Sequence, residues 1–225
     1  MIVSKGNIVF RRLTHDDIEL VRQMRNSPEI NSTMVYTDFI TPEMQEKWFK
    51  SVNNIYNFYF IIENDGKKVG LINGKNIDWE TRTMEAGIFY WDKSILKSQI
   101  PALCSLIFAE LGLLVFDLTA TAKIRKDNKN AIRFNKLIGF VSTNVETVSA
   151  DNEIFNTYIL NKENYLKRAK VVRKAFQLLL GSSKTRCLVE PEDYASGFGM
   201  ELEKRLPKKI VEQAEQTKEG KVIYF

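Results

Sequence analysis

Histidine and cysteine, the residue types most often used for metal ligation and nucleophilic catalysis, are scarce in this chain. The single histidine, His15, follows Thr14, and Thr14 and Asp17 have the spacing of a capping box at a helix start. We interpret His15 as a solvated residue of a first helical turn. Cys104 and Cys187 form no CxxC pair, which argues against a thiolate metal cluster or a disulfide framework. We expect both thiols to be buried and no metal site to be present.

Composition limits the classes of protein to which the chain can belong. Of the 225 residues, 44% are hydrophobic and 27% are charged, which supports a sizeable core and argues against a disordered or fibrous chain. The net charge of +5 lies in residues 166–225, whereas residues 1–165 are neutral. A neutral body argues against nucleic acid as the main partner, although the basic tail could touch an acidic one.

No stretch reaches the roughly 18 apolar residues of a membrane span, and the N-terminus has no apolar signal-peptide core. We therefore expect a cytoplasmic protein that does not contact a membrane.

Apolar periodicity predicts the elements that must position any site. A strand is expected at 8–13, a helix at about 15–25, and a second helix with Thr41 as N-cap and Pro42 at its first position. Asp65-Gly66 predicts a hairpin turn, and Gly139 predicts the left-handed end of a helix. The other expected strands cover 58–62, 68–76, 84–91, 118–124, 141–148 and 153–160, and the other helices 101–111 and 129–138.

The polar segment 161–165 separates two expected units, a domain at 1–165 and a basic, helical C-terminal extension at 166–225. Within the extension, an amphipathic helix is expected up to a break at Gly181-Ser182-Ser183, followed by an amphipathic segment at about 200–214. The last five residues have β character and could join a sheet edge. Such an extension either packs on its own domain or docks on another subunit, which would give a homo-oligomer.

This order of strands and helices resembles the GNAT (GCN5-related N-acetyltransferase) fold, an α/β fold with a mixed, mostly antiparallel sheet flanked by helices. Asn128, Ala131 and Gly139-Phe140 fit the family's Asn-x-x-Ala pattern and its helix ending in Gly-Phe. The resemblance covers residues 7 to about 165. Its opening section resembles the branch of ribosomal-protein N-acetyltransferases and of the sugar-nucleotide N-acetyltransferase of pseudaminic acid synthesis, through Arg25-Asn26, Met34, Ile40-Thr41 and Trp48.

The resemblance implies transfer of an acetyl or related acyl group from acyl-CoA to a primary amine, without a metal. Family members bind the pyrophosphate on a glycine-rich loop at a helix start, but residues 92–101 contain no glycine. Two readings follow. Either Ser98, Gln99 and the free amides of Ala102 and Leu103 still hold the phosphates with the help of Lys93 or Lys97, or the site has decayed and the protein is a silent scaffold that binds a partner through its tail.

The family pattern also implies residue roles. Phe89 to Trp91 would supply backbone groups to the pantetheine amides, and Asn128, Ala131 and Phe134 would flank that arm. Glu85 is the candidate base. The alternatives are that Asn128 only caps its helix and that Glu85 is an exposed residue paired across the sheet with Lys or Arg.

Many relatives carry a tyrosine as general acid at the position that Asn135 occupies here. That role is absent, passes to water or falls to Tyr90, which could equally be an ordinary aromatic strand residue. On the acceptor side, Arg25, Asn26 and Tyr36 are the candidate contacts, with solvated loop residues as the alternative. The branch favours an amino-sugar nucleotide as acceptor, with a protein N-terminal amine second.

Overall fold

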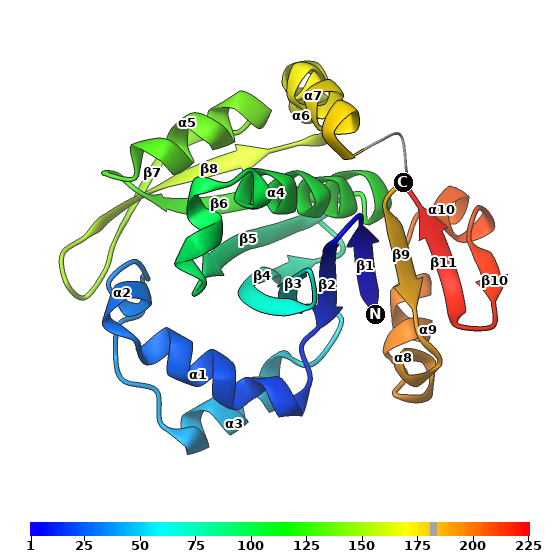
Figure 1. The fold of residues 1–225 in the computed structure, drawn as a ribbon, viewed down its shortest axis with the longest axis horizontal. Coiled ribbons are helices and arrows are strands. Elements are labelled where there is room, and N and C mark those ends of the chain that lie inside the picture. Colours follow the sequence, from blue (N-terminus) through cyan, green and yellow to red (C-terminus); the bar gives the residue numbers. More distant parts are fainter. Residues whose placement is uncertain (181–183) are drawn as a thin grey trace.

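A sheet of 11 strands crosses the molecule (Figure 1) in the computed structural model, which describes residues 1–180 and 184–225. In spatial order the strands are β10 (Glu215–Thr217), β11 (Gly220–Tyr224), β9 (Arg186–Val189), β1 (Ile2–Lys5), β2 (Ile8–Arg12), β3 (Phe58–Asn64), β4 (Lys67–Asp78), β5 (Thr83–Tyr90), β6 (Thr119–Arg125), β8 (Ile154–Leu160) and β7 (Val141–Val148). Neighbouring strands pair antiparallel except β5 and β6, which are parallel. The expected mixed, mostly antiparallel sheet is confirmed.

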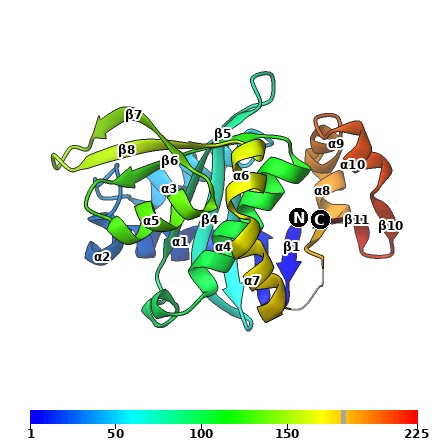
Figure 2. The same cartoon turned by 90° about the horizontal axis from the view of Figure 1, so that it is seen from above.

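Helices cover both faces of the sheet (Figures 1 and 2). One face carries α4 (Ile100–Glu110), which continues into a π-helical turn (Leu111–Val115), together with α5 (Lys129–Ile138), α6 (Lys162–Arg168) and α7 (Lys170–Leu180). The other face carries α1 (Ile18–Asn26), α2 (Pro28–Asn31) and α3 (Pro42–Val52). No helix in the described chain is both long and apolar enough to cross a membrane.

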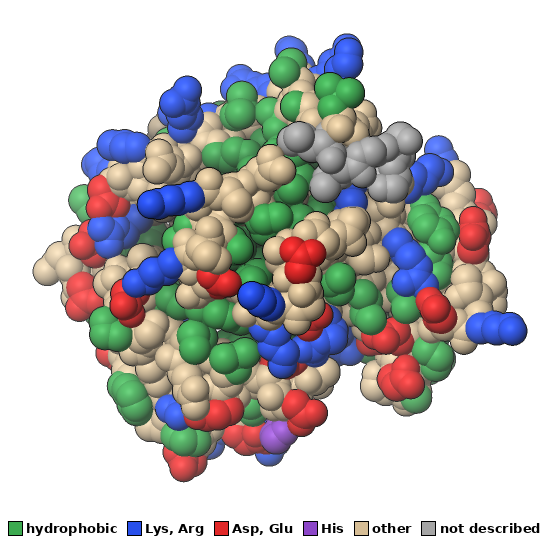
Figure 3. All heavy atoms as spheres, in the orientation of Figure 1, with side chains coloured by type: hydrophobic (Ala, Val, Ile, Leu, Met, Phe, Trp, Pro, Cys, Tyr) green, Lys and Arg blue, Asp and Glu red, His purple; other side chains and the backbone are tan. Residues whose placement is uncertain are grey.

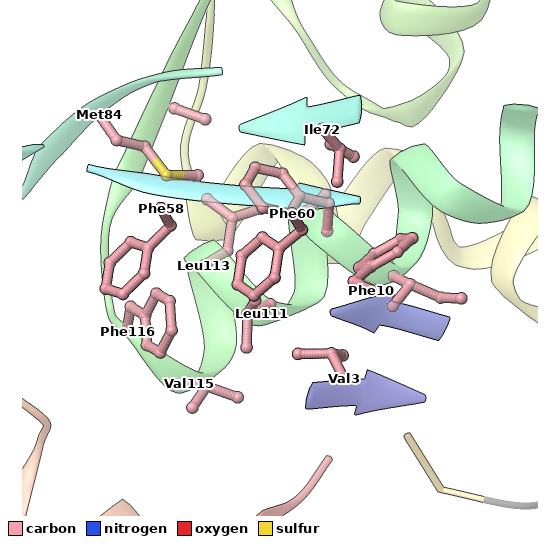
Figure 4. Packing of buried hydrophobic residues seen from close by; sticks show 14 of the residues in the cluster. Val3, Phe10, Phe58, Phe60, Ile72, Met84, Leu111, Leu113, Val115 and Phe116 are labelled. Atoms are coloured by element: carbon pink, nitrogen blue, oxygen red, sulfur yellow. The ribbon is translucent and has the colours of Figure 1, made fainter. Parts of the chain in front are cut away.

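The alternation of side chains along the strands produces two cores. Phe10, Phe58 and Phe60 point toward α4 and the π-helical turn, where they pack with Leu111 and Leu113 (Figure 4). On the opposite face a smaller core joins the sheet to α1 and α3, and it contains Leu13, Ile18, Val21, Phe49, Ile61 and Leu71. The sheet is therefore fixed from both sides, and any opening in it is held by packed helices.

Local sequence signals fix several element ends. The Thr41 hydroxyl accepts the Met44 amide at 3.2 Å, and the Thr14–Asp17 capping box forms as expected. His15 is exposed, with its Nε2 2.9 Å from Glu46, and both cysteines are buried and unpaired. These expectations are confirmed.

The C-terminal extension differs from the expected helical segment. It contains α7, the short helices α8 (Pro191–Ala195), α9 (Phe198–Glu203) and α10 (Lys208–Glu212), and the strands β9, β10 and β11. The last strand joins a sheet edge, as expected, by pairing with β9, which in turn pairs with β1. Periodicity missed β1 and β9 because each has only four residues. The expected break at Gly181-Ser182-Ser183 lies outside the described residues.

Because β9 is hydrogen-bonded to β1, one sheet runs through both expected units. The division at residue 165 and a homo-oligomer formed through the extension both stay predictions.

Surface charge is mixed on the face shown in Figure 3, where Lys and Arg side chains are interspersed with Asp and Glu. That face offers no uniformly basic surface for a nucleic-acid backbone.

Gly139 provides a stability test of the helix end next to the cavity described below. Its φ is +110°, and an added Cβ would lie 2.7 Å from the Asn164 carbonyl oxygen. Gly139→Ala should therefore lower the free energy of unfolding by about 2 kcal/mol or more, through strain and a backbone clash together. Gly197→Ala is the control, since its φ is +81° but no atom lies within 4 Å of the added Cβ. Equal losses in the two variants, measured by urea unfolding, would show that the clash contributes nothing.

Asp17 predicts an acid-sensitive contribution to stability. Its carboxylate is 1% exposed and accepts hydrogen bonds of 2.8 Å from Arg11 and Lys68. Burial acts to raise the pKa of Asp17, but the hydrogen bonds from Arg11, Lys68 and Thr14 outweigh it and hold the pKa well below its usual range.

A carboxylate whose pKa is depressed by folding stabilises the fold above its unfolded-state pKa of about 3.9, and this contribution disappears as pH falls toward the folded value. At pH 7, Asp17→Asn should lower the unfolding free energy by about 2 kcal/mol, because the buried carboxylate loses its charge-assisted hydrogen bonds from partly exposed Arg11 and exposed Lys68. The difference from wild type should shrink below about pH 4. Exposed Asp16→Asn is the control, and a pH-independent difference for Asp17→Asn would contradict the account.

Candidate active site

The sheet opens between its two parallel strands. β5 and β6 pair only from Thr83 with Thr119 to Glu85 with Thr121, and beyond these residues the described strands diverge. The facing backbone groups of β5 beyond Glu85 are therefore free to bind another molecule, since unpaired backbone polar groups require a partner.

A cavity of about 1080 Å³ occupies this opening and reaches both faces of the sheet. On β5, Met84, Ala86 and Ile88 line it from the α4 and α5 side, whereas Glu85, Gly87 and Phe89 line it from the α1 and α3 side. The cavity is thus a passage through the sheet rather than a hollow on one surface.

On the α4 and α5 side the walls of the passage include five alanines among larger apolar side chains. Alanines line it on four elements, namely Ala86 on β5, Ala109 on α4, Ala120 and Ala122 on β6, and Ala131 on α5. Side chains as small as alanine leave room for an extended, unbranched ligand chain. The free edge of β5 beside them could pair with amide groups of such a chain.

On the α1 and α3 side the lining mixes apolar side chains with polar and charged ones. Glu85 lies 3.0 Å from Lys75 and 3.8 Å from Lys123, so two ammonium groups share its carboxylate. The expected alternative of cross-strand pairing with Lys is therefore observed, and the role of Glu85 as base stays a prediction.

Tyr59 lies beside the Glu85 ion pairs with its ring against Trp48, at a centroid distance of 4.9 Å. Burial raises the pKa of Tyr59 to about 12, so its hydroxyl remains protonated.

The structure brings together some of the residues predicted from sequence and separates others. The predicted residues that line the cavity are Arg25, Tyr36, Glu85, Phe89, Asn128 and Ala131. Those that do not line it are Asn26, Tyr90, Trp91, Lys97, Ser98, Gln99, Ala102 and Phe134.

Tyr90 lies outside the cavity because its hydroxyl is buried against α4. It donates to the Pro101 carbonyl at 3.4 Å, and burial raises the pKa of Tyr90 well above its usual value. The structure thus favours the ordinary aromatic strand residue over the general acid. Trp91 donates its indole N–H to the Lys68 carbonyl at 2.7 Å, and Phe134 packs against the larger core.

The glycine-free segment before α4 folds as a short 3-10 helix (Lys93–Lys97), anchored by buried Ile95. The Ser98 hydroxyl is engaged locally, since it donates to the Ile95 carbonyl at 2.6 Å and accepts the Ile100 amide at 3.1 Å. Lys93 pairs with Glu29 at 3.3 Å. Within the described chain no hydrogen-bond acceptor is found for the Ala102 amide in the first turn of α4, which keeps it available to an anion. The expectation of a free Leu103 amide is wrong, because this amide donates to the Gln99 carbonyl at 3.0 Å.

Two asparagines have clear structural roles. Asn26 exchanges two hydrogen bonds with the backbone of Ile40, at 2.8 and 2.9 Å, and so fixes the segment before α3. The Asn128 side chain accepts the Ala131 amide at 3.0 Å, which confirms it as the N-cap of α5. Its part in coenzyme A binding stays a prediction.

Sequence reasoning missed several polar residues of the cavity. They are Gln45, Tyr59, Asn73, Lys75 and Lys123. Their elements were predicted, but which residues share a face across strands depends on register. Lys75 lies opposite Glu85, and Asn73 lies opposite Gly87, where an added Cβ would lie 2.9 Å from the Asn73 side-chain oxygen. The only sequence signal for this contact was Gly87, because a glycine inside a strand marks a place where another group approaches the backbone closely.

Comparison with known proteins adds a family to this geometry. The acetyltransferase (GNAT) domain family matches residues 7–141, more than half of the chain. The chain belongs to this family. It is therefore an acetyltransferase of the GNAT class, with acetyl-CoA as acetyl donor. No curated protein sequence matches the chain.

Solved structures show the same fold. Spermidine N-acetyltransferase from Vibrio cholerae, in complex with CoA and spermine, is 15% identical with a TM-score of 0.63, over 71% of this chain and 98% of that one. A chimera of the V. cholerae spermidine N-acetyltransferase and hSSAT is 18% identical with a TM-score of 0.60, over 72% of this chain and all (100%) of that one. A dodecameric structure of the V. cholerae enzyme is 17% identical, with a TM-score of 0.59 over 72% and 98% of the two chains.

The residues present in the passage fit the donor. The alanine-lined side accepts a narrow chain, and the free edge of β5 offers hydrogen-bonding groups to pantetheine amides. Binding of the phosphates by the Ala102 amide with Lys93 or Lys97 stays a prediction, since none of the three residues lines the cavity and Lys93 is paired with Glu29. Among the described residues, no group of three or more histidine, cysteine or acidic side chains could hold a metal.

Proposed function

We propose that this GNAT acetyltransferase transfers an acetyl group from acetyl-CoA to the primary amine of a small molecule. The observation that carries the proposal is the passage between β5 and β6, which opens on both faces of the sheet. A donor entering from the α4 and α5 side and an amine entering from the α1 and α3 side meet at Glu85. Such positioning supplies a large part of the rate enhancement in acyl transfer.

Within this site Glu85 is placed to accept a proton from the attacking amine, directly or through one water. Lys75 and Lys123 hold its side chain in position through ion pairs of 3.0 and 3.8 Å. The donor supplies an activated thioester. The amine nitrogen bonds to the carbonyl carbon and the carbon–sulfur bond breaks. Because the amide of Asn135 has no titratable proton to give, the thiolate takes a proton from water, and the hydroxide that remains takes the proton that Glu85 accepted from the amine.

The cysteines favour direct attack over an acetylated-enzyme intermediate. Burial raises the pKa of Cys104 to about 12 and that of Cys187 to about 12, so neither thiol is a ready nucleophile at neutral pH. Neither residue lines the cavity. We expect acetyl-CoA alone to release no CoA thiol in stoichiometric amounts.

For the acceptor we propose an amino-sugar nucleotide or a similar small amine, as the resemblance of Arg25-Asn26, Met34, Ile40-Thr41 and Trp48 to that branch suggests. The V. cholerae structure with bound spermine makes a polyamine the alternative to be tested. A protein N-terminal amine is a further alternative, although the helix-covered α1 and α3 side suits a small acceptor better.

Calorimetric titration with acetyl-CoA tests the proposal. We expect one-site binding with a dissociation constant in the micromolar range, accompanied by thermal stabilisation. Absence of both heat and thermal shift at about 1 mM ligand would overturn the proposal and favour the silent scaffold. A dissociation constant above 1 mM means a binding free energy of less than about 4 kcal/mol, which is too weak for a donor site.

A further inference from the structure

Three side chains on the acceptor side of the passage each have polar groups for which no hydrogen-bond partner is found among the described residues. Gln45 is 4% exposed and its side-chain nitrogen has no hydrogen-bond acceptor, and the same holds for the buried Nε of Arg25. Asn73 is 8% exposed, and no hydrogen bond to its side chain is found within the described chain. All three line the cavity. Buried polar groups are nearly always satisfied, so this part of the cavity is built to receive a polar molecule.

Arg25 is the charged member of this group. Its guanidinium donates to the Tyr36 carbonyl at 3.2 Å and lies 5.9 Å from the centre of the Phe89 ring. Among the described residues no carboxylate lies within ion-pair distance of it. Desolvation acts to lower the pKa of Arg25, which is the cost of burying a cation without a counter-ion.

The remaining charges of the cavity do not supply that counter-ion. Lys75 and Lys123 share the single carboxylate of Glu85, which leaves one positive charge in excess. Arg125 is already paired with Asp127, also on the cavity wall. Together with Arg25, the acceptor side therefore carries a surplus of positive charge.

Arg25 and Glu85 line the same cavity, so one bound molecule could contact both. The phenol of Tyr59 is close enough to both groups that Glu85 acts to raise its pKa and Arg25 acts to lower it. Tyr59 thus lies near both the carboxylate that would take the proton and the guanidinium that has no counter-ion, and all three residues line the cavity.

We propose that Arg25 binds an anionic oxyacid group of the acceptor, a phosphate or a carboxylate, while the acceptor's amine lies at Glu85. This inference rests on the proposed function and defines its substrate class as amines that carry an anion. The uncharged donors of Gln45 and Asn73 accompany Arg25 around the same ligand. Polyamines, whose remaining charges are positive, meet the surplus of Arg25, Lys75 and Lys123 and are excluded by repulsion.

A matched series of amines tests the inference through rates of CoA release. It consists of 3-aminopropyl phosphate, 4-aminobutanoate, 3-aminopropanol and 1,3-diaminopropane, which differ mainly in the charge at the far end. We expect kcat/KM for the better of the two anionic amines to exceed that for the neutral alcohol by about tenfold to a hundredfold, the effect of one charged hydrogen-bonded pair. The diamine should be the poorest, and the order of phosphate and carboxylate identifies the oxyacid.

Substitution of Arg25 should remove the preference for anionic over neutral amines. In Arg25→Gln, kcat/KM for the preferred anionic amine should fall to the level of the neutral alcohol, whose own value stays within about threefold. Arg25→Lys keeps the charge and should retain part of the preference. Lys50→Gln is the charge-matched control, because Lys50 is exposed on α3 and does not line the cavity.

Equal use of anionic and neutral amines by the wild type, or a preference that survives in Arg25→Gln, would overturn the inference. Neither result would argue against acetyl-CoA binding, on which the proposed function depends. Conversely, if acetyl-CoA does not bind, the anion site is still tested by titrating the protein alone with 3-aminopropyl phosphate, where only the wild type and the Lys50→Gln variant should bind.

Discussion

Ala122→Phe is expected to abolish acetyl-CoA binding while the protein remains folded. Ala122 lies on β6, beyond the last residues that pair with β5, and its methyl group lines the α4 and α5 side of the passage. A benzyl ring at this position would occupy the space that the pantetheine chain needs. The affinity for acetyl-CoA should fall by more than about 100-fold, a loss of more than about 2.7 kcal/mol.

The ring would enter open space rather than a packed core, so the unfolding free energy should change by less than about 1.5 kcal/mol. The matched control is Ala150→Phe, which adds the same ring at an exposed position between β7 and β8. Calorimetric titration and thermal unfolding of both variants provide the measurements. Wild-type affinity in a folded Ala122→Phe variant would mean that the donor does not pass between β5 and β6.

The second large effect is expected at Glu85. Glu85→Gln keeps the shape of the side chain but removes the group that accepts the amine's proton. We expect kcat to fall by about 100-fold to 10,000-fold, the usual contribution of a positioned acid or base. The dissociation constant for acetyl-CoA should stay within about threefold of the wild-type value, because Glu85 faces the acceptor side.

Asp127→Asn is the control for the charge of the cavity, since Asp127 is a second carboxylate on its wall but lies at the far end of β6, beside Arg125. Its kcat should fall by less than about tenfold if only Glu85 handles the proton. Similar losses of kcat in both variants would indicate a general electrostatic effect rather than a base at Glu85.

The parts of the fold that depend on neighbouring residues could be predicted from the sequence. Thr41, Asn128 and Gly139 fix helix ends by hydrogen bonds or backbone conformations within a few residues, and the structure has each of them in the expected role. Long alternating segments such as the one that became β4 were also found, although their ends shifted by a few residues.

The site depended on long-range geometry and was predicted only in part. Tyr90 follows Phe89 on β5 and Trp91 comes directly after the strand, yet only Phe89 lines the cavity. The divergence of β5 from β6 and the position of α4 decide which side chains remain accessible. Gln45 and Asn73 lie on separate elements that meet only in the folded chain. No local pattern marks such residues as partners.

The segment before α4 illustrates the limit of a motif-based reading. The absence of glycine suggested that the pyrophosphate site was altered, and the structure shows a 3-10 helix held by Ile95 in place of a glycine-rich loop. The passage between β5 and β6 nevertheless remains open. A helical turn can leave a free amide at the start of α4 without any glycine, because the first amides of a helix have no partner within it.

A crystal structure of the protein with bound CoA tests the central claim most directly. Our account predicts that the pantetheine arm lies between β5 and β6, hydrogen-bonded to the free edge of β5 beyond Glu85, with the sulfur beside the Glu85 carboxylate and the phosphates at the first turn of α4. CoA bound on another surface, with the passage between the two strands empty, would contradict it.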